Sequence, residues 1–181
     1  NYEITASNRK TADLFSINET KKLFNSIKPH VVINSAAKVG GILANDTFRT
    51  EFILSNLKIN MNIIESLTEH PKTKLINLGS SCIYPLGASV PIKETSLMTG
   101  QLEPTNSPYA MAKLAAIEMG DAITKQYGNK VVNLMPTNLY GPKDNFSENE
   151  SHVIPGLIHK MHKAKSNNSS SFSVWGTGKP L

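Results

Sequence analysis

A tyrosine and a lysine four positions apart have the residue types and spacing for acid–base chemistry. Tyr109 and Lys113 lie in a segment that predicts a helix, so both side chains share one helix face. A free phenol has a pKa of about 10. A nearby ammonium group favours the phenolate, so the pair could donate and accept a proton near neutral pH. Ser80, in the run Gly79-Ser80-Ser81, could hold a carbonyl or hydroxyl group against the phenol.

The surroundings of this pair matter, because a bare Tyr-x-x-x-Lys is common by chance and usually marks a solvated helix face. Residues 75–78 are apolar enough to predict a buried parallel strand that leads into the serines. Ser107 and Pro108 predict the N-cap and the first position of the tyrosine-bearing helix. This placement favours the catalytic interpretation over the solvated face.

The remaining chain supplies elements that could position such a site. We predict strands at 2–6, 30–34, 73–78 and 130–135, with another beginning at 172–175. Helices are predicted at 17–27, 50–69, 108–127 and 152–165. Strands and helices that alternate without hairpin signals predict an α/β fold with a Rossmann-type, doubly wound parallel sheet. Ligands of such sheets bind outside the carboxyl ends of the strands, so the loops after Asn34, Leu78 and Met135 should converge on one site.

Composition limits the class of protein. The 181 residues are 39% hydrophobic and 18% charged, which is typical of a globular chain with one sizeable core. The net charge of +5 is scattered, which favours an anionic small molecule and gives no reason to expect nucleic acid as a partner. The single cysteine excludes an internal disulfide and fits a reducing compartment. No stretch is apolar enough to span a membrane, and we expect a cytoplasmic protein without a membrane partner.

One expected motif is absent from these residues. A Rossmann fold normally begins with a strand and a Gly-x-x-Gly-x-x-Gly turn that cradles a pyrophosphate, and the 181 residues contain no such turn. We therefore expect a fragment that lacks the first strand and its Gly-rich turn, binds NADPH weakly by itself and is inactive alone. In this interpretation residues 1–142 are a partial NAD(P)-binding domain, and residues 143–181 begin a smaller, truncated substrate-binding region.

The motifs together resemble the extended short-chain dehydrogenase/reductase superfamily, which includes the nucleotide-sugar epimerases and dehydratases. Within it, the chain is similar to enzymes that epimerise C3 and C5 of GDP-4-keto-6-deoxy-D-mannose and reduce its C4 with NADPH. The segments that carry the resemblance are 36–42, 79–85, 102–106, 109–113, 135–142, 144–146, 151–155 and 174–176.

The resemblance implies two sets of catalytic residues. Ser80 would hydrogen-bond the C4 oxygen, Tyr109 would protonate that oxygen as NADPH delivers hydride, and Lys113 would hold the nicotinamide ribose and keep the tyrosine acidic. Cys82 and His152 would be the acid and base that epimerise C3 and C5, in an order that stays open. Without the resemblance, Cys82 would be interpreted as a small buried hydrophobe and His152 as a polar residue at a helix start.

The resemblance also implies binding residues. Arg9 would pair with a 2′-phosphate, which favours NADPH over NADH. Lys160 stands where an arginine is common, which keeps the charge and loses the bidentate fork. The other cofactor positions are Asp13, Leu14, Ala36, Ala37, Lys38, Asn56, Gly79, Ser80, Ser81, Lys113, Pro136, Thr137, Asn138 and Leu139. The substrate positions are His152, Lys160 and Trp175, although Trp175 could be a core residue, and no metal is implied.

Two alternative functions stay open beside this resemblance, and the superfamily also implies an oligomeric state. Another nucleotide-sugar epimerase or dehydratase, such as a 4-epimerase, would share the triad without needing Cys82 and His152. A non-catalytic, truncated form would bind no dinucleotide. In the superfamily the long helix and the tyrosine helix form a four-helix dimer interface, so we expect a homodimer. Candidates for an apolar outer stripe are Ile117, Met119 and Ile123.

Overall fold

The fold was obtained as a computed structural model that describes residues 2–148, 150–174 and 176. Three parallel strands form its sheet in the order β1 (Val31–Asn34), β2 (Lys74–Leu78) and β3 (Lys130–Leu134). The helices are α1 (Ile17–Ile27), α2 (Ile42–Thr47), α3 (Arg49–Thr68), α4 (Ser107–Tyr127) and α5 (Val153–Ser166), with short 3-10 turns η1 (Ser81–Ile83) and η2 (Glu94–Ser96). The predicted α/β fold with a parallel sheet is confirmed.

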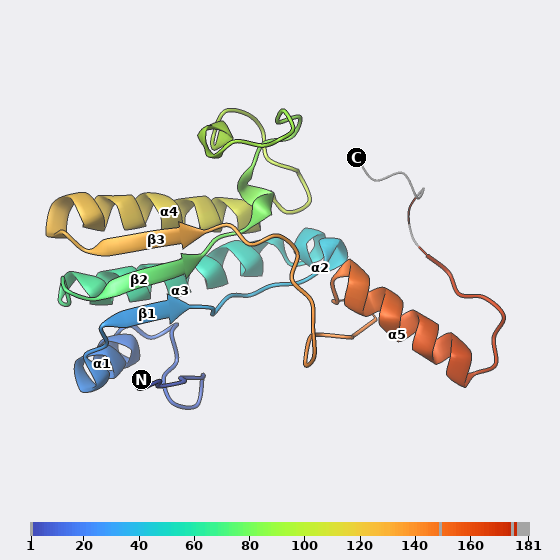
Figure 1. Cartoon of the computed structure of the whole chain (residues 1–181), viewed down its shortest axis with the longest axis horizontal. Helices are drawn as coiled ribbons and strands as arrows, with labels where there is room; N and C mark the ends of the chain where they lie inside the picture. The colour runs from blue at the N-terminus through green and yellow to red at the C-terminus, as the bar shows by residue number, and fades with distance from the viewer. Residues whose placement is uncertain (1, 149, 175, 177–181) are drawn as a thin grey trace.

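Helices α1, α3 and α4 cover one face of the sheet, and the core lies between them and the strands (Figure 1). Leu75 of β2 is buried there against Phe24 of α1 and the apolar stripe of α3. The opposite face behaves differently. Val31 and Ile33 of β1 are 48% and 65% exposed, so β1 is covered on one face only within the described residues. Alternate residues of a strand point to opposite faces, and the helices of the described part of the chain that pack against this core lie on one side only.

Three asparagines form a ladder across the covered face. Asn34, Asn77 and Asn133 occupy matched positions on β1, β2 and β3. The Asn34 amide donates to Asn60 Oδ1 of α3 at 3.0 Å and to Asn77 Oδ1 at 3.3 Å, and the Asn77 amide donates to Asn133 Oδ1 at 3.1 Å. Asn34 Oδ1 accepts from the backbone N–H of Ala36, so the ladder also fixes the start of the loop after β1.

Breaking the ladder at its middle should cost stability. Asn77→Leu leaves the half-buried Asn133 Oδ1 without its donor, so the loss should fall toward the lower end of the about 1–3 kcal/mol that an unpaired buried polar group costs. Replacing Asn133 by leucine as well removes the orphaned group, so the double variant should lose less stability than the sum of the two single variants. Urea unfolding of the four proteins in this double-mutant cycle measures the difference. Additive losses would mean that the ladder contributes nothing as a unit.

Several predicted elements differ from the observed ones. Residues 2–6 and 172–174 are irregular rather than strands, because no neighbouring strand in the described residues pairs with them, and Trp175 lies outside the described residues. The short helix α2 was not predicted. Helix α4 begins at Ser107 with Asn106 as its N-cap, one residue before the predicted cap, and ends at Tyr127 as predicted, with Gly128 as a left-handed C-cap. Among the described residues, no helix combines the length and apolar character needed to cross a membrane.

Candidate functional site

The carboxyl ends of the three strands point toward the side of the molecule where α2 and the first turn of α5 lie (Figure 1). Strand β2 leads into η1, where Ser80 Oγ accepts from the backbone N–H of Cys82 at 3.3 Å. Gly79 N donates to Leu134 O at 2.7 Å, which closes the end of β2 against β3. A side chain at Gly79 would meet the sulfur of Met135, part of a flexible side chain that can turn away, and its Cβ would lie 3.1 Å from Leu134 O, so the junction is tight.

Tyr109 and Lys113 lie in the first turns of α4, beside the end of β2. Lys113 is only 4% exposed, and its ammonium donates to Leu78 O at 2.7 Å. That nitrogen is 5.7 Å from the centroid of the Tyr109 ring, and the same ring meets Phe52 of α3 edge-on with centroids 6.2 Å apart. The predicted shared helix face is therefore observed, with the lysine tying α4 to the strand that carries Ser80.

Burial sets the proton affinities of this pair. It raises the pKa of the Tyr109 phenol; hydrogen bonding with Ser80 lowers that pKa, and the neighbouring Cys82 thiol raises it. Burial also lowers the pKa of Lys113. The expectation that the ammonium makes Tyr109 more acidic is wrong for this structure, because the Lys113 ammonium is bonded to Leu78 O and desolvation of the phenolate dominates. At neutral pH Tyr109 is a protonated phenol and can donate.

The lowered pKa of Lys113 predicts a pH-dependent stability difference. Between that pKa and the unfolded value of about 10.4, the unfolded chain binds a proton that the folded chain has released, so stability rises with pH. Relative to Lys113→Met, the free energy of unfolding of the protein that keeps Lys113 should rise through this alkaline window, by up to about 1.4 kcal/mol per pH unit. The comparison is made in a Tyr109→Phe background, because a phenol whose ring centroid lies 5.7 Å from the Lys113 ammonium would itself titrate differently in the two proteins. Parallel stability curves from urea unfolding at graded pH would contradict the shift.

The loop after β1 is held against α3 by one buried side chain. Asn56 Oδ1 accepts from Lys38 N, and its amide donates to Lys38 O, both at 3.0 Å, so the two residues exchange hydrogen bonds. The Lys38 ammonium lies 5.3 Å from the centroid of Phe52, the ring that also meets Tyr109. Ala36 and Ala37 precede it half-buried. Asn56 thus holds this loop against α3, and the cofactor roles of these residues stay predictions.

Other predicted site residues lie farther from the strand ends or on exposed segments. Arg9 is exposed and stacks its guanidinium 4.9 Å from the Phe15 ring centroid. Asp13 accepts from Phe15 N at 3.1 Å, and Leu14 packs against the core. In the loop after β3, Pro136 is half-buried. Its neighbours Thr137, Asn138 and Leu139 are exposed.

The start of α5 carries the remaining predicted residues. His152 is the exposed N-cap residue of this helix, and Lys160 donates to Ser173 O at 3.4 Å. Within the described part of the chain, no side-chain hydrogen bond links His152 to Cys82 or Tyr109. The structure thus brings Ser80, Cys82, Tyr109 and Lys113 together directly.

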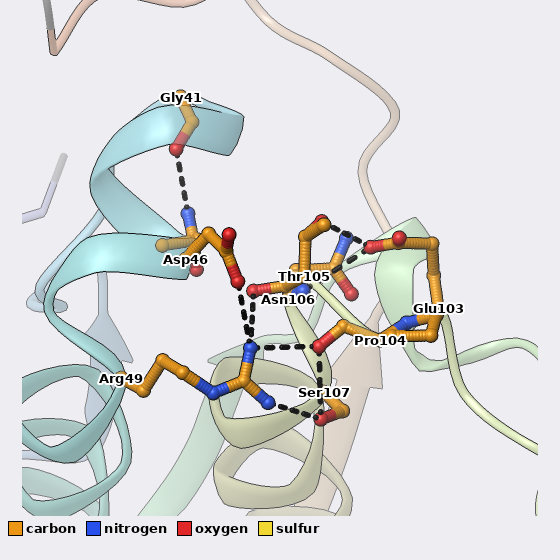
Figure 2. Close-up of polar contacts among 9 residues, drawn as sticks. Gly41, Asp46, Arg49, Glu103, Pro104, Thr105, Asn106 and Ser107 are labelled. Atoms are coloured by element: carbon orange, nitrogen blue, oxygen red, sulfur yellow. Dashed lines mark hydrogen bonds and ion pairs between the residues drawn. The ribbon is translucent and has the colours of Figure 1, made fainter.

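An arginine that the sequence analysis did not identify organises the approach to α4. Figure 2 shows the Arg49 guanidinium between Asp46 and the loop that precedes α4. Its Nη1 donates to Asp46 Oδ1 at 3.0 Å and to Pro104 O at 2.8 Å, and Nη2 donates to Ser107 Oγ at 3.4 Å. Arg49 therefore ties the start of α3 to the segment that leads to Tyr109. Its distance in sequence from that segment left no local signal.

Glu103 fixes the same segment from within (Figure 2). Its Oε2 accepts from the backbone N–H of Asn106 at 3.1 Å and from the Thr105 hydroxyl. Burial raises the pKa of the Glu103 carboxyl, but the hydrogen bonds from Thr105 and Asn106 and the nearby Arg49 outweigh it, so the pKa lies below its usual range. An acidic residue three positions before a helix cap was the available sequence signal. The described residues contain no group of three or more His, Cys, Asp or Glu side chains arranged to hold a metal.

Comparison with known proteins agrees with this geometry. GDP-L-fucose synthase of Sinorhizobium fredii is 50% identical over 98% of this chain and 57% of its own length. GDP-L-fucose synthase of Escherichia coli is 44% identical over 99% of this chain and 56% of its own length. The chain thus spans little more than half the length of these curated relatives. A crystal structure of a GDP-L-fucose synthetase from Naegleria fowleri bound to NADP superposes with a TM-score of 0.83 at 36% identity, covering 95% of this chain and 56% of that one.

Residues 1–181 match the NAD dependent epimerase/dehydratase family over their whole length. The parallel sheet, the Ser80–Tyr109–Lys113 grouping at its carboxyl edge and these likenesses agree with one another. This chain belongs to the NAD dependent epimerase/dehydratase family.

Proposed function

We propose that the natural protein containing these residues converts GDP-4-keto-6-deoxy-D-mannose to GDP-L-fucose with NADPH as reductant. The observation that carries this proposal is the pair of half-buried Tyr109 and buried Lys113, packed beside Ser80 and Cys82 at the end of β2. The names of the relatives support the substrate, and the NADP bound to the Naegleria fowleri structure supports the cofactor. The reaction consists of epimerisation at C3 and C5 followed by reduction at C4.

Reduction at C4 needs a proton donor beside the keto oxygen. Tyr109 is suited to this role because burial keeps its phenol protonated at neutral pH. The side chain of Ser80 is a hydrogen-bonding neighbour of that phenol. When NADPH is bound, it supplies the hydride. Lys113 is anchored by Leu78 O and is directed along the same helix face, where its ammonium can hold the ribose.

Epimerisation needs an acid and a base on opposite sides of the sugar ring. The 4-keto group acidifies the hydrogens on C3 and C5, so one group can remove a proton and another can return one on the opposite face. Cys82 follows Ser80 in η1 and is half-buried next to Tyr109. His152 is the exposed N-cap residue of α5, and the segment just before it contacts Gly41 in the loop after β1. A thiol and an imidazole both exchange protons near neutral pH.

Binding roles complete the proposal. Arg9 would pair with the 2′-phosphate of NADPH, and Asp13 and Leu14 would lie beside the adenine. The cofactor would run past Ala36–Lys38, the Gly79–Ser81 turn and residues 136–139. Lys160 would contact the nucleotide sugar together with His152 and Trp175. Residues 1–142 would form the cofactor-binding part and residues 143–181 the start of the substrate-binding part, and we place the enzyme in the cytoplasm.

The experiment that tests the function is identification of the product. The natural protein is incubated with GDP-4-keto-6-deoxy-D-mannose and NADPH, and the product is analysed by NMR. We expect GDP-L-fucose, whose ring-proton couplings report inversion at C3 and C5, with consumption of NADPH. A product changed only at C4 would favour a 4-epimerase. Absence of both turnover and NADPH binding would favour a non-catalytic form.

We further propose a homodimer formed by α3 and α4. The predicted outer position was wrong for Ile123, which lies in the core, and for Met119, which packs against it, whereas Ile117 is half-buried outside that cluster. Exposed apolar side chains of these helices include Leu54, Met61 and Met111, which are 48%, 52% and 47% exposed. A groove of about 320 Å³ between the starts of α3 and α4 is lined by Ile53, Pro108 and Met111 among others.

The exposed apolar side chains of α3 and α4 give a testable prediction for assembly. The natural protein should be a dimer in light scattering at micromolar concentration, and Leu54→Glu together with Met61→Glu should shift it to a monomer, because buried unpaired carboxylates are costly. Val90→Glu is the matched control, since Val90 is an exposed apolar residue on the loop before α4. A wild-type protein that is monomeric under these conditions would contradict the proposal.

A further inference from the structure

The segment that carries His152 docks on a glycine pair in the loop after β1. Gly41 N donates to Glu150 O at 3.1 Å. A Cβ atom added to Gly41 would lie 2.7 Å from Ser151 O, which is closer than real Cβ atoms approach another heavy atom. Residue 41 must therefore lack a side chain for the two segments to meet as they do.

The oxygen that packs on Gly41 belongs to the peptide that joins Ser151 to His152. A peptide unit is planar, so moving this oxygen rotates the plane and displaces the Cα of His152. Few other contacts fix the helix start. Within the described residues of α5, Pro155 is the buried side chain, while Val153 and Ile154 are exposed. The orientation of His152 thus depends on the contact with Gly41 more than on core packing.

The glycine pair is itself held in place by α2. Asn45 is buried, and its amide donates to Gly40 O at 2.8 Å and to Gly41 O at 3.1 Å. Gly156, in the first turn of α5, lies on the other side of Ser151, where a Cβ would meet Ser151 Oγ at 2.7 Å. That contact is with the end of a rotatable hydroxyl side chain, which can turn away. The backbone oxygen of Ser151 that packs on Gly41 cannot turn away in this manner.

We propose that Gly41, supported by Asn45, is a positioning residue that holds the Ser151–His152 peptide so that the imidazole faces the substrate carbons. This inference rests on the proposed function of His152 in epimerisation. Among the described residues, no hydrogen bond joins Gly41 to Ser80, Tyr109 or Lys113, so the effect of Gly41 should fall on proton transfer at C3 and C5. The reduction step should be affected much less.

The test compares two glycine-to-alanine variants of the natural protein. Gly41→Ala should slow exchange of the C3 and C5 protons with deuterated water by about 10²-fold, the loss expected from a displacement of about 1 Å at a reacting group. Oxidation of GDP-L-fucose by NADP⁺, the reverse of the reduction step, needs no proton transfer at C3 or C5 and should stay near the wild-type rate. Gly156→Ala is the matched control, since it adds the same methyl group on the other side of Ser151, and should leave both rates near wild type.

The outcomes separate the inference from the proposed function. A wild-type protein without exchange would overturn the proposed function. Wild-type exchange with an unaffected Gly41→Ala variant, or equal loss of both rates in that variant, would overturn the inference. If Gly41→Ala does not fold, Asn45→Asp replaces the test, because it keeps the volume and sets a carboxylate against the carbonyls of Gly40 and Gly41. It should show the same selective loss of exchange, and an equal loss of both rates would overturn the inference.

Discussion

Tyr109→Phe is expected to slow reduction at C4 by about 10²–10⁴-fold, the range that general acid catalysis contributes. The substitution removes the phenolic proton and keeps the ring that meets Phe52 edge-on, so the fold and NADPH binding should persist. Because burial raises the pKa of this phenol, the wild-type group is protonated at the pH of the assay. NADPH oxidation at saturating substrate measures the loss.

Tyr127→Phe is the matched control for this result. Tyr127 lies on the same helix, at its far end, and is exposed. Its substitution should leave the rate of NADPH oxidation unchanged. If Tyr109→Phe reduced the keto sugar as fast as the wild-type protein, another group would be the proton donor and the assignment of α4 as the catalytic helix would fail.

Cys82→Ser and His152→Asn are expected to remove proton exchange at C3 and C5, again by about 10²–10⁴-fold. A serine hydroxyl is too weak an acid to share a proton with a ring carbon near neutral pH, and an asparagine amide has no titrating nitrogen. Both variants should still bind NADPH and reduce the unepimerised sugar slowly, giving a different stereoisomer. Mass spectrometry of the product formed in deuterated water measures the exchange.

His162→Asn serves as the control for the histidine variant, because His162 is an exposed residue farther along α5. It should exchange both protons at the wild-type rate. If Cys82→Ser and His152→Asn also exchanged both protons at that rate, the epimerase assignment would be wrong. A 4-epimerase that shares only the Ser80, Tyr109 and Lys113 grouping would then be the better interpretation.

Local patterns predicted the parts of the fold that local chemistry determines. The helix predicted at 17–27 matches α1, the helix predicted to end at 127 ends there, and the spacing of Tyr109 and Lys113 predicted their common face. Each of these depends on neighbours in sequence. The same holds for the alternation of strands and helices that predicted the parallel sheet.

Features that depend on partners distant in sequence could not be predicted in the same way. The helical period identifies the apolar residues that share one face of a helix, but it does not identify the element against which that face packs. Ile123 was therefore assigned to an outer face, whereas it lies in the core. The raised pKa of Tyr109 results from its burial, and the Tyr-x-x-x-Lys spacing gives no information about burial. The asparagine ladder requires the register of three strands, and the contact of Gly41 with Ser151 requires the docking of α5.

The central claim is that one site performs both proton exchange at two ring carbons and hydride reduction at a third. Its most direct test is a single reaction of the natural protein with GDP-4-keto-6-deoxy-D-mannose and NADPH in deuterated water, with deuterium counted by NMR beside NADPH oxidation. The account predicts one deuteron at C3 and one at C5 of the product for each NADPH oxidised. Reduced product without deuterium at C3 and C5 would contradict it.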